Sequence, residues 1–534
     1  MARASTVHRV PQRGTPIPPG IAGVVGTSRT TNQKATWDRA SDVLKTVSLL
    51  LVSAPVLAFA WAFGGSRTDV LARVMPWASL ACALGTFLLP QHHPGETWGA
   101  AVRRSAWGVL KDPFFWVALV FLGYLVVPLF NVSLCPVCDW KAIDAGADPY
   151  PPMRYLPFCA SPREHAGVLW WFGPALLSAL GIRHGLTRSG KRSLLELLAW
   201  NGAALALLGF LQYVTGAQFP YWGKPMRPTQ FFSVFGYPNM GGAYFTLMYS
   251  LSLGIWCSQM GDAEASPLDQ GGHPFLRAHY PFVAVALSLA AVLATLCRAA
   301  IVLSVALTAA FFIYVVLRAF VGNDWRRARR FRSAVVAISL MLGLFGAIYV
   351  YAPPEVGREL GTVNPLAVAD RVSGKAQYHT RVATAIMRDF PLFGVGGWGY
   401  RHFSQAYMTP EELKHQQVVG GANVHNDYLQ FLAEHGLVGF SLLVACVWLL
   451  ALPTGREWKR RAAKALAAER SNMGSSTLTL FAVSPPIVWT FLGCVAVLVH
   501  AFGDCPFRSA AVLAAFLAIL PASFGFMPRE PGDF

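Results

Sequence analysis

Residues 280–317 read YPFVAVALSLAAVLATLCRAAIVLSVALTAAFFIYVVL, and Arg298 is the only charged residue within them. A helix that spans a membrane needs about 20 mostly apolar residues, so this run is long enough for two spans and too long for one. We expect two helices that turn at Arg298. An Arg at such a turn is costly unless it meets water, an anion or a partner charge. The stretch therefore predicts a membrane protein and marks a first candidate functional residue.

The composition extends this prediction to the whole chain. Of the 534 residues, 54% are hydrophobic and 13% are charged, against about 25% charged in an ordinary soluble domain. This excludes a disordered or collagen-like protein and argues against a soluble enzyme. The net charge of +17 would suggest a nucleic-acid partner in a soluble protein. Here the basic runs flank apolar segments, where they act as topology signals and as contacts with anionic membrane lipids, so no nucleic acid is expected.

Apolar runs recur along the chain, which predicts an all-α polytopic membrane protein with about twelve transmembrane helices. The runs lie near 43–62, 70–90, 113–134, 166–182, 193–214, 234–257, 280–296, 299–317, 333–352, 436–452, 482–501 and 510–526. Residues 43–526 then form the membrane domain. The polar, basic residues 1–42 are expected to be a disordered arm, and 527–534 a short tail.

Charge placement predicts the orientation of these spans. Besides the N-terminal arm, four connections on the same side are basic, namely 91–112, 183–192, 318–332 and 453–480. Cytoplasmic loops carry such an excess of Lys and Arg, so both termini are expected in the cytoplasm.

The longest connection, 353–424, falls on the outward side, and a loop of that length is commonly functional. An apolar stripe repeats there every four residues, at Tyr378, Val382, Ile386 and Phe390. It predicts an amphipathic helix near 376–390 that ends before Pro391. We therefore expect a small helical extracytoplasmic cap.

Two short motifs allow more than one interpretation. Cys135, Cys138 and Cys159 share an outward loop. A disulfide from Cys159 to either of the others is the favoured interpretation there, free thiols are the alternative, and a metal or redox site is the least plausible. Residues 394–399, GVGGWG, satisfy GxGxxG but follow no expected strand, so a dinucleotide site is rejected. They form either a simple turn or an anion cradle. No P-loop or metal-ligand motif is found in the sequence, so neither a cofactor nor a metal ion is expected.

Two basic places are candidates for binding an anion. The Arg298 guanidinium suits a diphosphate, which it can grip through two hydrogen bonds, although an Arg that only marks the interface is the alternative. The expected cap helix and its approach carry Arg371, Lys375 and Arg381. Arg381 lies off the apolar stripe and can face a ligand; a solvated basic face is the alternative.

The richest polar run is 423–430, NVHNDYLQ, which leads straight into an apolar run. Asn423 is a candidate N-cap, and His425 would then lie near a helix N-terminus, where the local field favours the neutral imidazole. His425 is thus a candidate general base, with a headgroup anchor as the alternative. Glu434 and His435 are expected at the membrane interface. A further candidate binding residue, Asn239, opens a span beside glycines that packing alone could explain.

These motifs occur in an order that resembles the O-antigen ligase family of bacterial membrane proteins, with its O-antigen polymerase relatives. The resemblance rests on Phe63-Gly64-Gly65, Gly236-Tyr-Pro238-Asn239, Cys297-Arg298, Pro391-Leu-Phe-Gly394-Val-Gly396, His425-Asn426-Asp427-Tyr428-Leu429 with Glu434-His-Gly436, and His500-Ala-Phe-Gly-Asp504-Cys-Pro506-Phe507. It covers about residues 43–526.

The resemblance implies a fold like that of the C-type glycosyltransferases. It implies an inverting, metal-independent enzyme that moves a glycan from undecaprenyl diphosphate to an acceptor on the periplasmic face of the bacterial inner membrane. The acceptor would be lipid A core, a protein or a glycan. Carried over, Arg298 and a loop Arg bind the diphosphate, His425 helps to deprotonate the acceptor, and Asn239, Asn426 and Tyr428 contact substrate. Ala376 stands where the family has its loop Arg, so Arg371, Lys375 and Arg381 share that expectation.

Three alternatives stay open. An O-antigen or exopolysaccharide polymerase and a protein O-oligosaccharide ligase would use the same chemistry and motifs. A secondary transporter belongs to another class of protein; twelve spans suit it, but the spans carry few charges of the kind that relay ions.

Overall fold

The computed structural model describes residues 27–93, 95–134, 151, 153, 155–224, 231–265, 278–320, 324–351, 357, 378–419, 423–471 and 484–526. The chain forms two compact units, Met1–Thr46 and Val47–Phe534. In the first, the described part is helical from Thr27, and Lys45 pairs with Asp42 at 2.8 Å. All that follows concerns the second unit.

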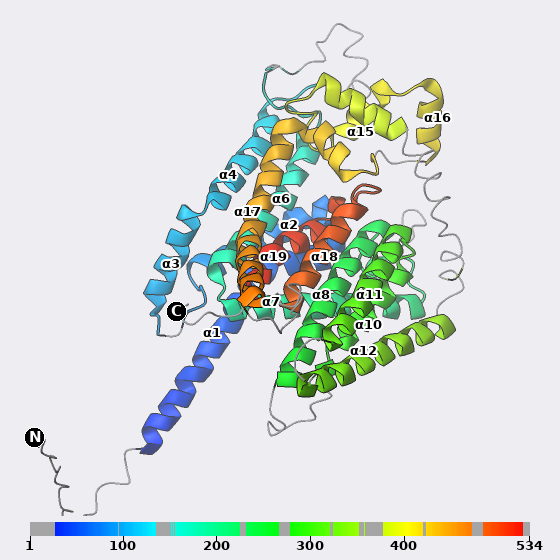
Figure 1. Cartoon of the computed structure of the whole chain (residues 1–534). Coiled ribbons are helices and arrows are strands. Elements are labelled where there is room, and N and C mark those ends of the chain that lie inside the picture. The colour runs from blue at the N-terminus through cyan, green and yellow to red at the C-terminus, as the bar shows by residue number, and fades with distance from the viewer. Residues whose placement is uncertain are drawn as a thin grey trace, which may run out of the picture. The chain divides into compact units, whose positions relative to one another are not determined.

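Helices make up nearly all of the described residues, which contain isolated β-bridges but no strand (Figure 1). The longer helices are α1 (Thr27–Trp61), α2 (Thr68–Phe87), α3 (Trp98–Lys111), α4 (Pro113–Val126), α6 (Pro162–Gly185), α7 (Arg188–Val214), α8 (Pro238–Ala265), α10 (Phe282–Ala294), α11 (Arg298–Ala319), α12 (Asp324–Tyr351), α17 (Asp427–Ser471), α18 (Pro485–His500) and α19 (Ala510–Ala522). Each of the twelve expected runs overlaps one of them.

Eight helical segments in the described residues are long and apolar enough to cross a membrane. Shorter apolar helices accompany them at Phe282–Ala294, Pro485–His500 and Ala510–Phe526. The prediction of an all-α polytopic membrane protein is confirmed. The sequence did not predict α3, which forms inside the connection 91–112. Thr97 caps this helix, and Glu96 pairs with Arg104 at 2.9 Å.

The turn predicted at Arg298 is present. α10 ends at Ala294 and α11 begins at Arg298, so three residues reverse the chain, with Leu296 in a left-handed conformation (φ 55°). α8 packs closely against this turn, because a Cβ on Gly242 would lie 2.7 Å from the Cβ of Cys297. Packing therefore explains this glycine and fixes where α11 starts.

α17 is a broken helix. Its break is at Gly436, whose φ of 60° and ψ of −171° are accessible essentially only to glycine. The segment 391–396 pairs with the break: Leu437 and Val438 donate to the carbonyls of Pro391 and Leu392 at 2.9 and 3.0 Å. In return, the amides of Val395 and Gly396 donate to Ala433 and Glu434, at 3.1 and 2.8 Å. The hydrogen bonds that the helix loses are thus made across to this segment.

This pairing decides between the two interpretations of the glycine motif. The amides of residues 394–397 and of Gly399 all donate within the protein, Gly397 to the ring of His165 at 2.8 Å. They are therefore engaged and do not form an anion cradle. The segment is a turn that seals the break in α17.

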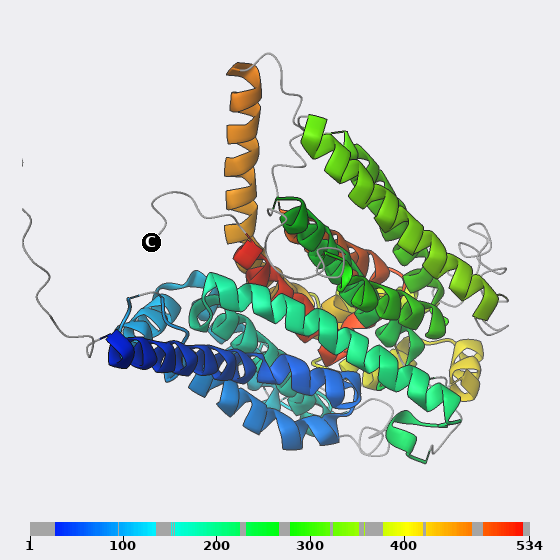
Figure 2. The ribbon, with the colours of Figure 1, turned by 90° about the horizontal axis from the view of Figure 1, so that it is seen from below.

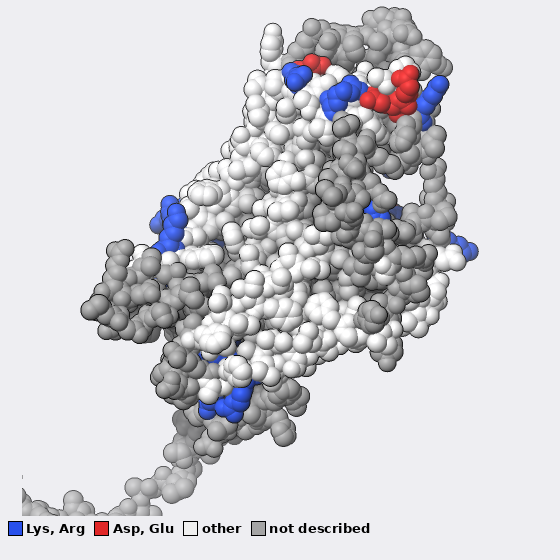
Figure 3. Space-filling model, turned by 45° about the vertical axis from the view of Figure 1, so that its right-hand side comes forward, with Lys and Arg blue, Asp and Glu red and all other residues white. Residues whose placement is uncertain are grey.

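Residues 378–389 are helical, where the sequence predicts the cap helix. With α15 (Gly399–Phe403), the loop before α6 and the first turns of α17 they form a core of their own, and α16 (Pro410–Val419) follows α15 along the chain. The buried members of this core include Phe158, Val382, Ile386, Tyr400 and Val424. Figure 3 shows acidic and basic side chains gathered at the top of the face it draws, while uncharged side chains cover most of the described surface below.

Two other sequence predictions are corrected. Cys159 is a free, buried thiol that donates to the carbonyl of Pro128 at 3.1 Å, so the predicted disulfide from Cys159 is wrong; Cys135 and Cys138 lie outside the described residues. Glu434 and His435, expected at the membrane interface, are buried inside the bundle.

The C-terminal end of α17 (orange) extends away from the neighbouring helices when seen from below (Figure 2).

Candidate functional site

His425 lies just before the first turn of α17 and faces the loop that joins α18 to α19. Its Nδ1 lies 3.3 Å from Oδ1 of Asp504 in that loop. The start of α17 is tied to the end of α18, because the amide of Asp427 donates to the carbonyl of Ala501 at 2.9 Å. His425 has a φ of 56°, a conformation that is uncommon for residues other than glycine and often marks functional sites.

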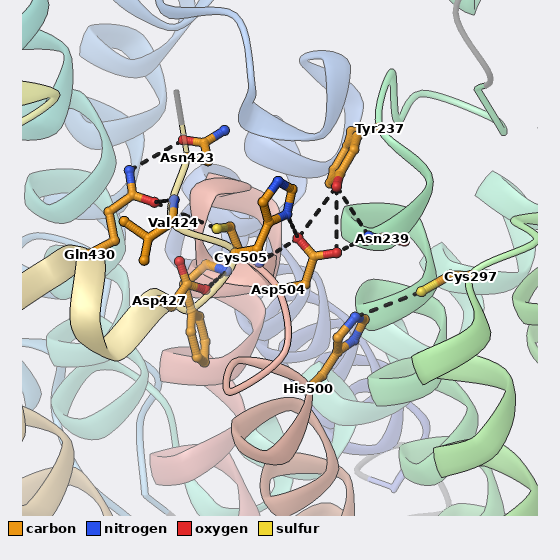
Figure 4. A network of polar contacts seen from close by, with 12 residues as sticks. Tyr237, Asn239, Cys297, Asn423, Val424, Asp427, Gln430, His500, Asp504 and Cys505 are labelled. Carbon is orange, nitrogen blue, oxygen red and sulfur yellow. Dashed lines mark hydrogen bonds and ion pairs between the residues drawn. The ribbon is translucent and has the colours of Figure 1, made fainter. Parts of the chain in front are cut away.

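Asp504 is the buried partner in this pair. Its side chain is 9% exposed, whereas that of His425 is 46% exposed. Figure 4 shows that the groups around Asp504 point at its carboxylate: Tyr237 from one side, with its hydroxyl 3.4 Å from both oxygens, and the amide of Asn239, which donates to Oδ2. The backbone N–H of Cys505 donates to Oδ1 at 2.7 Å. These donors hold the carboxylate in one orientation.

Tyr237 remains a donor in this arrangement. Burial of the phenol and the neighbouring Asp504 carboxylate raise the pKa of Tyr237 well above its usual range. The amide of Asn239 also donates to the Tyr237 hydroxyl at 3.1 Å. Asn239, predicted from sequence as a binding residue, is thus joined to the same carboxylate that faces His425.

Arg298 is connected to this group through its neighbour. Cys297, the N-cap residue of α11, has its thiol 3.7 Å from Nε2 of His500, the last residue of α18 (Figure 4). Burial raises the pKa of the Cys297 thiol to about 12, so it stays protonated. The amide of Asp504 donates to the carbonyl of His500 at 3.1 Å. The helix end that carries Arg298 therefore meets the loop that carries Asp504.

The remaining predicted residues of the His425 motif have structural partners. Asn426 Oδ1 accepts from the amide of Leu429 at 3.0 Å, so Asn426 caps α17 and the predicted cap at Asn423 is wrong by three residues. The hydroxyl of Tyr428 donates to the carbonyl of Leu498 at 2.8 Å. Both contacts fix the entry into α17, and their predicted role in substrate binding stays a prediction.

The cap brings further groups close to His425. The ring of His379 is centred 6.3 Å from that of His425, and its Nδ1 lies 2.9 Å from the hydroxyl of Tyr400. Arg381 forms an ion pair with Glu412 of α16 and donates to the carbonyl of Tyr407 at 3.2 Å. Arg371 and Lys375 lie outside the described residues.

A large apolar cavity lies beside the site. It has a volume of about 300 Å³ and is bordered by α6, α17, α18 and α19, with aromatic side chains such as Trp171, Phe431 and Trp448 in its lining. Its lining also includes the ionisable residues Asp427, Tyr428, Glu434, His435 and Arg508, from the first turns of α17 and the turn after Asp504. The cavity is therefore mostly apolar and reaches the start of α17, just after His425.

Several residues of this site escaped the sequence analysis. Asp504, Tyr237 and His500 stood in the quoted motifs but received no role, because their partners are distant in sequence. Glu434 was misplaced for the same reason: Arg508, 74 residues later, donates to its Oε2 at 2.5 Å. In the sequence, only the closeness of His500 and Asp504 in the last connection between spans could have indicated a functional site there.

With this geometry in view, residues 283–444 match the family model described as O-antigen ligase. The chain thus carries an O-antigen ligase domain. The match covers α10, α11 with Arg298, the cap and the start of α17 with His425, and it confirms the resemblance drawn from the motifs. Asp504 lies beyond it. No curated protein matches the chain. Members of the family are membrane ligases and polymerases of the glycosyltransferase kind, and this general function holds for the O-antigen ligase domain.

Proposed function

We propose that this O-antigen ligase domain transfers a glycan from an undecaprenyl diphosphate carrier to an acceptor hydroxyl, with inversion and without a metal ion. The observation that carries the proposal is the pair formed by His425 and Asp504 at the ends of apolar helices, next to the helix end with Arg298. The charge pattern of the connections supports a site on the periplasmic side of the inner membrane, with both termini in the cytoplasm.

In this proposal His425 is the general base. When Nδ1 carries the proton it donates to Asp504, which leaves the Nε2 lone pair for the acceptor hydroxyl. Asp504 then stabilises the imidazolium that forms after proton transfer. The N-terminal end of α17 favours the neutral ring, whereas the carboxylate of Asp504 favours the imidazolium. Such a base contributes about 10²- to 10⁴-fold to the rate.

The acceptor oxygen forms a bond to the anomeric carbon while the bond from that carbon to the diphosphate oxygen breaks. Negative charge grows on the departing diphosphate. The guanidinium of Arg298 is proposed to bind it there, because a fixed cation stabilises the developing charge. Arg381 would add to this binding only after leaving Glu412, and Arg371 and Lys375 are further proposed diphosphate ligands.

A lipid-linked donor also fits the apolar cavity. A hydrocarbon chain inside it would meet aromatic and aliphatic side chains, and the lining includes Asp427, two residues after His425. This arrangement favours a glycosyltransferase with a lipid substrate over a secondary transporter.

The test replaces His425 and Arg298 separately by Ala in the full chain, reconstituted with lipid-linked donor and an acceptor. We expect loss of glycan transfer by at least about 10²-fold in each variant. His402→Ala is the matched control, because His402 lies in the cap and pairs with Glu164 at 2.8 Å, outside the site. Full transfer by both test variants would overturn the proposal, and substrate uptake that survives His425→Ala would indicate a transporter.

The product separates the remaining alternatives. A ligase places one glycan on lipid A core, and a protein O-oligosaccharide ligase places it on a protein. A polymerase lengthens the lipid-linked chain. The His425 and Asp504 pair serves all three in the same way.

A further inference from the structure

Gln430 lies in the first turns of α17, and its side chain is almost fully buried, at 1% exposure. Its Oε1 accepts from the backbone N–H of Val424 at 3.0 Å and from the thiol of Cys505 at 3.6 Å. Its Nε2 donates to Asn423 Oδ1 and to Glu434 Oε1, both at 3.2 Å. All four hydrogen-bonding positions of this carboxamide are therefore used.

These contacts join the two segments that carry the proposed catalytic pair. Val424 directly precedes His425, and Cys505 directly follows Asp504. Figure 4 shows the carboxamide of Gln430 pointing toward both segments. The pair itself is separated by 3.3 Å, close to the limit for a useful hydrogen bond. A small relative shift of the two segments would break it.

The carboxamide is itself held in one orientation. Glu434, which accepts from its Nε2, also accepts from Arg508 at 2.5 Å, and Arg508 lies just beyond Asp504. Burial and the nearby Asp427 carboxylate raise the pKa of the Cys505 thiol, which therefore remains a donor to Gln430. Because a buried amide pays a penalty for each unmade hydrogen bond, this arrangement resists rotation.

We propose that Gln430 is a positioning residue that aligns His425 with Asp504. This inference rests on the proposed function, since it assumes that the pair acts in glycan transfer. Gln430 contacts both segments and does not itself line the apolar cavity, so we expect it to act on the reaction through the pair. Its loss is expected to lower kcat and to leave KM for donor and acceptor nearly unchanged.

The test uses Gln430→Leu and Gln430→Met, which both remove the four hydrogen bonds without adding a charge, and Met keeps the length of the Gln side chain. Initial rates are measured on the reconstituted full chain and normalised to folded protein. We expect kcat to fall about 10- to 100-fold in both variants, with KM within about 3-fold. Asn201→Leu is the matched control, because it removes a buried amide that joins Trp61 and Tyr244 far along the chain from the pair.

Both substitutions are then repeated in an Asp504→Ala background. If Gln430 acts by aligning the pair, its substitution should lower kcat by less than about 3-fold in this background, where the pair is already absent. The inference is overturned if the Gln430 substitutions lower kcat equally with native Asp504 and with Asp504→Ala. It is also overturned if they leave kcat normal with native Asp504. If Gln430→Leu does not fold, Gln430→Met carries the same comparison. Loss of transfer in His425→Ala with normal kcat in the Gln430 variants would contradict this inference alone, whereas normal transfer in both His425→Ala and Arg298→Ala would contradict the proposed function.

Discussion

Asp504→Asn tests the proposed chemistry most directly, because it keeps the shape of the side chain and removes its charge. Oδ1 of Asp504 accepts from the amide of Cys505 at 2.7 Å and lies 3.3 Å from His425. Oδ2 faces Asn239 and Tyr237. A carboxamide has one oxygen and cannot serve both sides. We expect that oxygen to stay toward Cys505, since a backbone N–H cannot turn away and the Tyr237 hydroxyl can.

The expected loss follows from this geometry. His425 would keep a hydrogen bond to the new amide oxygen but lose the charge that strengthens it. A hydrogen bond to a charged group contributes about 1.5–3 kcal/mol, and a neutral one about 0.5–1.5 kcal/mol. The difference of about 1–2 kcal/mol corresponds to a kcat roughly 5- to 30-fold lower, at about 1.4 kcal/mol per factor of ten. Asp504→Ala removes the partner completely and is expected to cost about 10²-fold or more.

The assay is single-turnover glycan transfer by the reconstituted protein with saturating lipid-linked donor. Asp389→Asn is the matched control: Asp389 lies in the cap, where it accepts from the hydroxyl of Tyr407 at 2.6 Å. Rates within twofold of the native protein for both Asp504 variants, together with a large loss for His425→Ala, would refute the role of Asp504. His425 would then act without a partner carboxylate.

Three further predictions concern packing, the cysteines and the cap. Gly436→Ala should abolish stable expression, because its Cβ would lie 2.3 Å from the backbone of Leu392; normal thermal stability would contradict the described break. Burial raises the pKa of the Cys159 thiol to about 11, so Cys159 should not react with maleimide at pH 8 in the folded protein. It should react once the protein is denatured, with no reductant added; a requirement for reductant would indicate a disulfide. Glu412→Gln should release Arg381 and lower the donor KM by up to about 5-fold, the scale of an exposed ion pair; an unchanged KM in both Glu412→Gln and Arg381→Ala would exclude Arg381 from binding.

The sequence predicts those features that are encoded locally. A span needs only a run of apolar residues, so each expected run overlaps a helix, and the lone charge at Arg298 marks the turn between α10 and α11. The stripe of Val382 and Ile386 likewise predicts the cap helix, since both side chains are fully buried there. His425 and Arg298 stood out because polar residues at the ends of apolar runs are costly without a purpose.

The sequence does not predict features that depend on distant partners. Leu429, Leu432 and Gly436 keep a helical spacing up to this point, so nothing local indicates that α17 breaks there. The break exists because residues 391–396 supply the missing hydrogen bonds, and only the folded chain brings them together. Asp504 and Glu434 were missed for the same reason. Their partners, His425 and Arg508, are 79 and 74 residues away.

The broken helix also explains how polar groups can gather at this place in an apolar bundle. A continuous α17 would bond its own carbonyls at Ala433 and Glu434 and leave no place for the segment 391–396. Because Gly436 opens one turn, that segment can pack there, anchor the cap helix before it, and form four backbone hydrogen bonds across the break. The cap then carries His379 to within 6.3 Å of His425. The first turns of α17 therefore hold the cap with their backbone and the proposed catalytic pair with the side chain of Gln430.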